Sequence, residues 1–522
     1  MTDKLKKICF KNHYNLIISV FIIVFFIINL YDLKYKLKDT INNTKYYIFF
    51  SVISIFLYII FLFLNKITSK KIENKIQRVF LIVALVFGSI FLVLSPLFTG
   101  SDEHNHYYRI YEITDGVLVT PTDKLVGSQM PESLQNTFEI ASGNNTKIKY
   151  RDIKKMKKIK LKKDSTKQYG DLWTNSYNNT ALYSPIQYLP QVIGFMIGKI
   201  FNLGPLFIGI LGRIFNLIFY VLIGYFCLKI LPKSKLFYFF ILISPNMLQC
   251  ATTLSADAFT NGIFLLIISI FLNFYYRENI IKRSEEMLLF VLCVFISLCK
   301  IVYLPIVLLL LIINKNKFEK GKKEKIIFNA ITIFCSIVVS LLWIKCTKGV
   351  FAIEYDKAEL QKQFIIHNLF EYALILIRTF SFNIVKYVEC LFVGTTMYHS
   401  QLEMPILISF IYIAIVLISL IKEKDENKFK IIHKTLVVSI GIAIIGLIST
   451  AIYIQCTAQY ISVGNNIIQG IQGRYFIPVI FLIPFIIKPM NRKINIDEKI
   501  MYKSVLSINI ITFFYMINQF IK

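Results

Sequence analysis

Residues 79–116 are VFLIVALVFGSIFLVLSPLFTGSDEHNHYYRIYEITDG. They begin with an apolar run of about twenty residues, the length that a helix needs to cross ~30 Å of hydrocarbon. Acidic, histidine and tyrosine side chains follow directly after the run. We therefore predict a membrane-spanning helix, taken as residues 78–98, that brings chemically reactive side chains to the membrane surface.

The same apolar character extends over the whole chain. Of the 522 residues, 56% are hydrophobic and 17% are charged, whereas a soluble domain carries about 25% charged residues. This composition excludes an ordinary soluble enzyme, a secreted disulfide scaffold and a disordered protein. Each long apolar block is predicted to be a helix, because backbone groups in lipid must be hydrogen-bonded internally. The predicted spans are residues 14–31, 46–65, 78–98, 205–230, 236–250, 257–275, 286–299, 301–314, 325–345, 403–421, 433–455, 474–488 and 501–520.

The net charge of +28, from 59 Lys and Arg against 31 Asp and Glu, also fits a membrane protein. Basic residues gather in short loops, as they do on the cytoplasmic side of membrane proteins, most strongly at 66–78, 314–325 and 422–434. This pattern places the N-terminus in the cytoplasm and argues against nucleic acid as a partner. The abundance of Ile, Phe, Lys and Asn suggests a bacterial source. We predict a multi-pass protein of the bacterial cytoplasmic membrane.

Two long loops are then predicted on the outer side, at about residues 99–204 and 346–402. Residues 183–201 (YSPIQYLPQVIGFMIGKIF) are apolar enough to span. A span here would move the basic residues 231–235 and 276–285 to the outside, against the rule that cytoplasmic loops are basic. We therefore predict that 183–201 lies in the outer interface, or dips into the membrane and returns.

The first of these loops contains the basic stretch KIKYRDIKKMKKIKLKK at residues 147–163. The simpler interpretation, which we favour, is a solvated run of charge. The alternative is a basic helix with an apolar stripe of Ile153, Met156 and Ile159, whose lysines face an anionic lipid or polymer.

The acidic pair Asp102 and Glu103 is the first candidate for chemistry. A carboxylate at the outer edge of the membrane can accept the proton of an incoming hydroxyl, as general-base catalysis requires. The competing explanation is that acidic residues favour helix N-termini through the helix dipole, by about 0.3–1 kcal/mol each. Asp102, His104 and His106 could instead bind a divalent metal, although a His-x-His spacing suits a strand or loop better than a helix. No other cofactor is indicated.

Further ionisable side chains stand in apolar surroundings on the predicted outer side, namely Arg213, Asp257, Lys300 and Arg474. Such residues are costly in a membrane and are candidates for function. The three cations suit the phosphate of a lipid-linked substrate. The structural explanations are snorkelling to the interface or an ion pair such as Asp257–Arg213. Together these residues predict an outward-facing site for a lipid phosphate.

The order of these features resembles a known family. The stretches concerned are SDEHNHYYRIYEITDG (101–116), YSPIQYLP (183–190), SPNMLQCATTLSADAFTN (244–261), CKIVYLP (299–305) and QGRYFIP (472–478). This arrangement is similar to the bacterial membrane-protein family known as domain of unknown function 2142, itself similar to the glycosyltransferase-C superfamily. The resemblance covers about residues 78–490.

The resemblance implies an all-α polytopic membrane protein with a glycosyltransferase-C-like bundle of about 13 transmembrane helices. It implies a long first outer loop that contains juxtamembrane helices and carries a catalytic carboxylate. The membrane domain would occupy residues 78–490. An N-terminal extension with two helices (1–77) would precede it, and a C-terminal helix (491–522) would follow it.

Individual positions can be carried over from the resemblance. Asp102 matches the catalytic acidic position, with Glu103 beside it. Lys300 matches a lysine near the lipid phosphate of related sugar transferases, and Asp257 matches a second outer acidic position. Family members often have Pro-Asp-Glu where this chain has Ser101 before its acidic pair.

The expected function is that of an inverting glycosyltransferase on the outer face of the membrane. It would move a sugar from a polyprenyl-phosphate donor to a cell-envelope glycan, polymer or lipid. Asp102 and Glu103 are the expected catalytic residues, and the expected substrate-binding residues are His106, Arg109, Arg213, Asp257, Lys300, Arg474 and Tyr475. The alternatives are a transporter or flippase of lipid-linked glycans, or a non-catalytic scaffold of envelope synthesis. Transporters tend to show internal repeats, and none is evident here.

Overall fold

The computed structural model describes residues 2–37, 43–68, 75–122, 126–142, 149–161, 166–168, 177–350, 355–394, 396–397, 400–402, 404–422, 429–487 and 496–521. The ends of the basic stretch 147–163 and parts of the basic loops 66–78 and 422–434 lie outside these residues.

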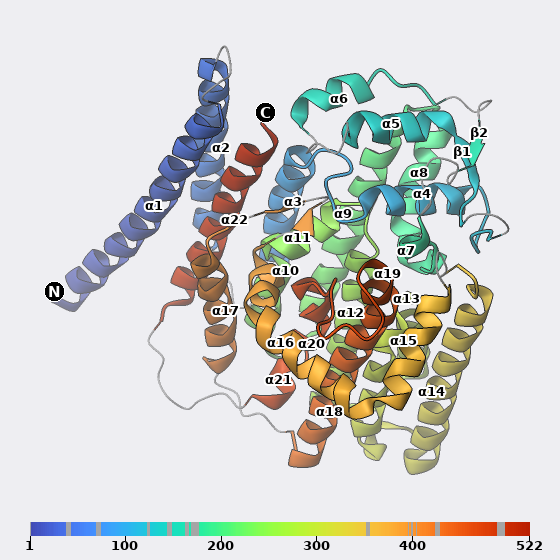
Figure 1. Ribbon diagram of the computed structural model, residues 1–522. Helices are drawn as coiled ribbons and strands as arrows, with labels where there is room; N and C mark the ends of the chain where they lie inside the picture. Colours follow the sequence, from blue (N-terminus) through green and yellow to red (C-terminus); the bar gives the residue numbers. More distant parts are fainter. Residues whose placement is uncertain are drawn as a thin grey trace.

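Helices dominate the described chain (Figure 1). Within it, eight are long and apolar enough to cross a membrane, which agrees with a multi-pass protein. They are α1 (Thr2–Lys36), α2 (Asn43–Thr68), α3 (Ile76–Leu94), α9 (Pro205–Ile230), α12 (Asp257–Tyr276), α14 (Gly321–Cys346), α18 (Ile431–Ile452), which continues through η5 (Tyr453–Thr457) and α19 (Ala458–Tyr460), and α22 (Glu498–Phe520).

The other predicted spans fall on shorter or broken elements, so the count of thirteen full spans is not confirmed. They are α10 (Lys235–Leu242) with α11 (Pro245–Thr252), α13 (Arg283–Cys299), η3 (Ile301–Ile312), α17 (Ile406–Ile421), and η6 (Gly473–Phe476) with α20 (Ile477–Ile480) and α21 (Ile483–Ile486). Prolines lie where α11, α20 and α21 begin, because proline interrupts the hydrogen bonds of a continuing helix. The 3₁₀ helix η3 has 12 residues and reaches about 24 Å at ~2.0 Å per residue.

The described parts of residues 99–204 form a layer at the upper right of Figure 1, with α5 and α6 at the top and α4, α7 and α8 to the right of α9. Its elements are α4 (Glu103–Thr114), β1 (Gln129–Pro131), α5 (Glu132–Ser142), α6 (Tyr150–Met156), β2 (Thr166–Gln168), α7 (Asn178–Ala181), η2 (Pro185–Tyr188) and α8 (Leu189–Ile200). Strands β1 and β2 are antiparallel, with Gln129 opposite Gln168. The layer has a hydrophobic core of its own, to which Tyr107, Phe138 and Phe195 belong.

Helix α8 shows why residues 183–201 do not form a span. Its 12 residues cover about 18 Å, less than the ~30 Å of a hydrocarbon core. It packs closely on α9, and a Cβ atom at Gly194 would lie 2.5 Å from the carbonyl oxygen of Leu211. The large side chains of Ile193, Met196 and Ile200 remain exposed on its other face. This arrangement agrees with the prediction of an interfacial segment.

Residues Tyr150–Met156 of the basic stretch form helix α6. The favoured interpretation of a solvated charge run agrees with the exposed lysines but not with the burial of the apolar side chains between them. Met156 is fully buried in the core of the layer, and Ile153 and Ile159 are half-buried. The apolar stripe therefore packs on the protein itself. Five lysines of the stretch are exposed: Lys154, Lys155, Lys157, Lys158 and Lys160.

The second predicted loop, 346–402, contains α15 (Tyr355–His367), α16 (Leu369–Phe392), β3 (Thr396–Met397) and β4 (Ser400–Gln401). The strands pair in antiparallel fashion. Helix α16 packs against η6 and α17, and Gly473 of η6 lies directly against the carbonyl oxygen of Tyr387. The loop therefore supports the segment that carries Arg474.

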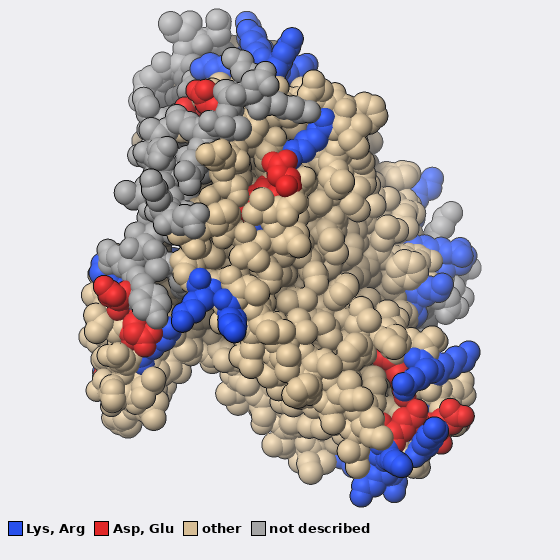
Figure 2. All heavy atoms as spheres, turned by 90° about the vertical axis from the view of Figure 1, so that its right-hand side faces the viewer, with Lys and Arg blue, Asp and Glu red and all other residues tan. Residues whose placement is uncertain are grey.

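The opposite end of the bundle carries the basic turns around η4 (Lys315–Lys317). Lys315, Lys320, Lys322 and Lys323 are all exposed there. Figure 2 shows charged side chains gathered at the lower end of the molecule, where Figure 1 places the start of α14, with a wide surface of other residues above them.

Helices α1, α2 and α22 form a group at one side of the bundle (Figure 1). Polar side chains join α1 to α22: Asn518 donates to the carbonyl oxygen of Asn29 at 3.2 Å and accepts from Lys36 at 3.3 Å. Interhelical hydrogen bonds of this kind stabilise helix association in lipid. The first and last helices of the chain thus pack together.

We expect Gly473→Ala to destabilise the protein, because its methyl group would overlap the carbonyl oxygen of Tyr387. Forcing extra volume into a close-packed contact costs about 1–3 kcal/mol. The matched control is Gly446→Ala in α18, where a Cβ atom meets no described heavy atom within 4 Å. Thermal unfolding of the purified variants in detergent measures the difference, and equal unfolding temperatures would contradict the packing described here.

Candidate functional site

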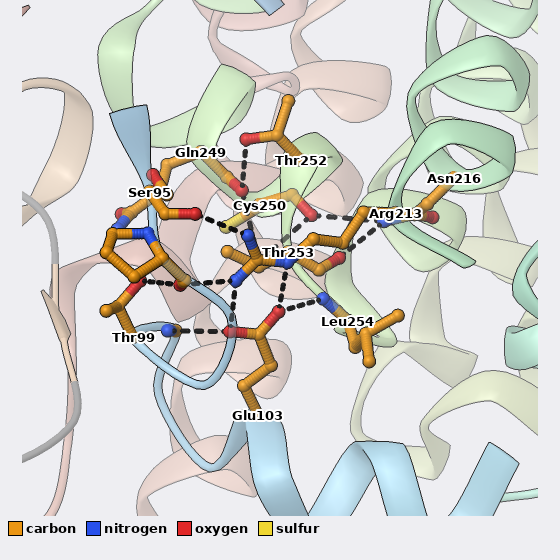
Figure 3. A network of polar contacts seen from close by, with 12 residues as sticks. Ser95, Thr99, Glu103, Arg213, Asn216, Gln249, Cys250, Thr252, Thr253 and Leu254 are labelled. Atoms are coloured by element: carbon orange, nitrogen blue, oxygen red, sulfur yellow. Dashed lines mark hydrogen bonds and ion pairs between the residues drawn. The ribbon is translucent and has the colours of Figure 1, made fainter. Parts of the chain in front are cut away.

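The buried carboxylate of Glu103 connects the end of α3 to the start of α4 and to the segment before α12. Its Oε1 accepts hydrogen bonds from Arg213 Nε at 2.6 Å and from the amide of Leu254 at 2.8 Å. Its Oε2 accepts from Arg213 Nη2 at 2.6 Å and from the amide of Gly100 at 2.9 Å (Figure 3). Both oxygens are therefore occupied by protein donors.

Arg213 supplies the other half of this network from within α9. Besides Glu103, its guanidinium donates to the carbonyl oxygens of Ser95 at 2.6 Å and Pro96 at 2.9 Å. Three residues further along α9, Asn216 donates to the carbonyl oxygen of Thr253 at 2.9 Å (Figure 3). We call the pair with these partners the Glu103–Arg213 clamp. The sequence suggests an ion pair of Arg213 with Asp257, but in the structure Arg213 pairs with Glu103 instead.

Asp102 directly precedes the clamp and has a left-handed backbone conformation, with φ of 53°. Non-glycine residues in such conformations cost of order 1–3 kcal/mol and persist only where surrounding contacts impose them. The clamp imposes it here, because it fixes Gly100 on one side and Glu103 on the other. The Asp102 side chain is half-buried, and its Oδ2 accepts a hydrogen bond from Ser101 Oγ at 3.4 Å.

The electrostatic surroundings of Asp102 change its acidity. Burial raises the pKa of this carboxyl above its ordinary value, and the positive charge of Arg474 opposes the rise only in part. The negative charge of Asp257 adds to the rise. A carboxyl with a raised pKa is better matched to proton transfer near neutral pH than an ordinary aspartate.

A second carboxylate, Asp257 at the start of α12, brings two cations together. Its Oδ1 accepts from Lys300 Nζ at 2.6 Å, and its Oδ2 lies 3.6 Å from Arg474 Nε. Lys300 lies between α13 and η3, as predicted, and Arg474 lies in η6. Between 11% and 14% of each of the three side chains is exposed. Two cations on one carboxylate leave an excess of one positive charge.

Aromatic rings surround this charged group. Lys300 Nζ lies 5.3 Å from the ring centre of Tyr183 and 5.5 Å from that of Tyr475. The His106 ring stacks on Tyr183 at 5.9 Å between centres, and its Nδ1 lies 2.7 Å from Tyr188 Oη. Burial lowers the pKa of His106 to about 3, so its imidazole is neutral at physiological pH.

Arg109 differs from the other expected substrate-binding residues. It is fully buried and donates to Glu112 at 2.7 Å and to the carbonyl oxygen of Leu118 at 2.6 Å. A further bond of 3.2 Å reaches the carbonyl oxygen of Tyr183. Its donors thus bind groups of the protein, and its contribution to the site is to fix the backbone of Tyr183.

The metal alternative finds no support in the geometry. Among the described residues, no group of three or more His, Cys, Asp or Glu side chains is arranged to hold a metal ion. His104 stacks on Phe138 at 4.4 Å between ring centres, and His106 faces Tyr188. The side chains of Asp102, His104 and His106 therefore do not form a ligand set.

A family model described as predicted membrane protein (DUF2142) matches residues 85–483, well over half of the chain. The chain belongs to this family. No curated protein and no solved structure matches it. The residues matched to the DUF2142 family include the clamp and the cluster of Asp257, Lys300 and Arg474. Helices α1, α2 and α22 lie outside the match.

Tyr303 of this DUF2142 member is next to the charged cluster but is not among the site residues expected from the sequence. Its hydroxyl donates to the carbonyl oxygen of Tyr475 at 3.1 Å and so joins the Lys300 segment to the Arg474 segment. The available signal was its position in CKIVYLP, which resembles the QYLP that contains Tyr188. Both motifs place a tyrosine next to the charged cluster.

We expect Glu103→Gln to destabilise the protein strongly, because it leaves the buried guanidinium of Arg213 without its counter-charge. Breaking one partner of a buried ion pair costs about 3–5 kcal/mol. Denaturant or thermal unfolding in detergent measures the loss.

The matched control for this prediction is Asp115→Asn, which breaks the pair of Asp115 with Lys199 at the same N–O distance of 2.6 Å. About half of the Asp115 side chain is exposed (51%), and exposed pairs contribute about 0–1 kcal/mol. If both substitutions lower the stability equally, the buried Glu103–Arg213 pair stabilises the fold no more than an exposed pair does, and the prediction is wrong.

Proposed function

We propose that this DUF2142 member is an inverting membrane glycosyltransferase. It moves a sugar from a polyprenyl-phosphate donor to a hydroxyl of a cell-envelope glycan, polymer or lipid on the outer face of the cytoplasmic membrane. One observation carries the proposal: Asp257, Lys300 and Arg474 come from three separate parts of the chain and meet in one cluster, and Asp102 lies within the electrostatic influence of Arg474 and Asp257. Ionisable groups in the apolar surroundings of a membrane bundle are costly and are candidates for function.

Lys300 and Arg474 are the proposed binding groups for the donor phosphate. Ammonium and guanidinium groups make strong charge-assisted hydrogen bonds to phosphate oxygens. Asp257 holds both cations in place before the donor arrives. The rings of Tyr183 and Tyr475 beside Lys300 offer flat apolar surfaces to the sugar.

Asp102 is the proposed general base. The acceptor hydroxyl attacks the anomeric carbon and gives its proton to the Asp102 carboxylate, while the bond from that carbon to the phosphate oxygen breaks. The polyprenyl phosphate leaves with the electron pair, and Lys300 and Arg474 stabilise its charge. We assign Glu103 to positioning Asp102 rather than to catalysis, because both its oxygens are engaged in the clamp.

The exposed lysines that follow one another from Lys154 to Lys160 support an anionic acceptor. They lie on the same layer as α4, which begins next to Asp102. Clustered positive charge raises the local concentration of a polyanion and speeds its association.

The deciding experiment is sugar transfer in proteoliposomes that contain envelope lipid extract and labelled polyprenyl-phosphate sugars. We expect Asp102→Asn to reduce transfer by at least about 100-fold, the size of a general-base contribution, with donor binding retained. Lys300→Ala should weaken donor binding, because it removes one of the two phosphate-binding cations.

The same assay tests the transporter alternative. If labelled donor crosses the bilayer unchanged with wild type and with Asp102→Asn alike, the protein is a transporter and the catalytic proposal is wrong. Normal envelope synthesis in cells that carry Asp102→Asn would instead favour a non-catalytic scaffold.

The pH dependence of transfer identifies the base. Asp102 must be ionised to accept a proton, so the rate should fall as pH decreases through its raised pKa. This acid limb should lie above the value of about 3.9 for an ordinary aspartate. His106 is already neutral above its pKa of about 3, so His106→Gln should leave the midpoint of the limb unchanged. A midpoint of kcat/KM that moves with His106→Gln would contradict the assignment.

A further inference from the structure

A basic hollow lies at the end of the bundle opposite the candidate site. It has a volume of about 310 Å³ and is lined by residues near the ends of four helices, among them Ile76 of α3, Lys235 of α10, Ser419 of α17 and Glu498 of α22. This volume is at the lower end of the ~300–1,000 Å³ range of small-molecule sites. The charge distribution of the sequence predicts that this end is cytoplasmic.

Three lysines face the hollow from two different elements. Lys233 and Lys235 flank the start of α10, and Lys422 follows the end of α17. Among the described residues that line the hollow, the only carboxylate is that of Glu498, whose Oε1 lies 3.7 Å from Lys422 Nζ. The described lining of the hollow thus carries more lysines than carboxylates.

The three lysines differ in the contacts that their ammonium groups make with the rest of the protein. Lys422 Nζ also donates to the carbonyl oxygen of Ile496 at 2.7 Å, and Lys233 Nζ lies 4.7 Å from the ring centre of Tyr276. Lys235 is half-buried, and its ammonium group makes no hydrogen bond or ion pair with another residue in the described ranges. A cation that has lost water without gaining a partner is unfavourable until an anion joins it.

We propose that this hollow binds a phosphate-bearing anion. The first turn of α10 adds backbone amides and the positive end of its dipole to the lysines. The hollow lies where spanning helices end, which is the depth of lipid headgroups, and basic pockets between transmembrane helices bind anionic headgroups. The ligand is thus the phosphate of an anionic phospholipid or a free phosphate. This site is separate from the Asp257–Lys300–Arg474 cluster and does not depend on the proposed transfer reaction.

The test uses the full-length protein in mixed micelles of phosphatidylglycerol and phosphatidylcholine, with native mass spectrometry to count retained phosphatidylglycerol. Each lysine near a headgroup changes its binding about fivefold, so Lys235→Gln should lower retention about fivefold and Lys235→Gln with Lys422→Gln further. The matched control is Lys322→Gln with Lys323→Gln, which removes two exposed lysines of α14 and should leave retention unchanged.

The outcomes distinguish a phospholipid ligand, a free phosphate ligand and a hollow that binds neither. Retention that falls in the hollow variants and resists added inorganic phosphate identifies a phospholipid. Retention that inorganic phosphate abolishes in wild type and in the control variant alike identifies a free phosphate site. Equal retention by wild type, Lys235→Gln and the control variant overturns the proposal. The single variant keeps the bond of Lys422 to Ile496, so its folding can be verified by an unchanged unfolding temperature.

Discussion

The buried ion pair of Glu103 and Arg213 is the interaction on which the rest of this structure depends. Two charges in a membrane-embedded protein lose most of their hydration, and their attraction compensates only if every donor and acceptor is used. Here the carboxylate receives four hydrogen bonds, and the guanidinium reaches two further carbonyl oxygens. The pair therefore fixes the relative positions of α3, α4, α9 and the segment before α12.

The clamp also explains how two carboxylates come to face one site. Asp102 is the residue directly before Glu103, and Asp257 comes three residues after Leu254, whose amide the clamp binds. A shift of either segment would move one carboxylate relative to the other. The left-handed backbone at Asp102 is kept by the same contacts. The clamp thus positions Asp102 and Asp257, while its own side chains are engaged with each other.

Irregular backbone gathers around the candidate site. Helices break before Pro245 and after Cys299, η5 is a π-helical turn, and η6 begins as a 3₁₀ turn. Non-helical backbone at membrane depth is tolerated where protein surrounds it, because its polar groups find partners there. Asn246 donates to the carbonyl oxygen of Cys390 at 2.6 Å, and Thr457 accepts from the amide of Gln469 at 3.0 Å. These breaks free Lys300 and Arg474 to face Asp257.

The sequence by itself determined the membrane class, the family and the polar residues worth examining, because apolar block length and the order of motifs are local properties of the chain. It also placed Lys300 at a turn and residues 183–201 outside the spans. Only the tertiary structure decided which charges pair: Glu103 and Arg213 are 110 positions apart, and Asp257 meets Lys300 and Arg474 rather than Arg213. It also decided that the stripe of α6 packs inward. Pairing and burial depend on contacts between distant segments, and no local pattern specifies which segments meet.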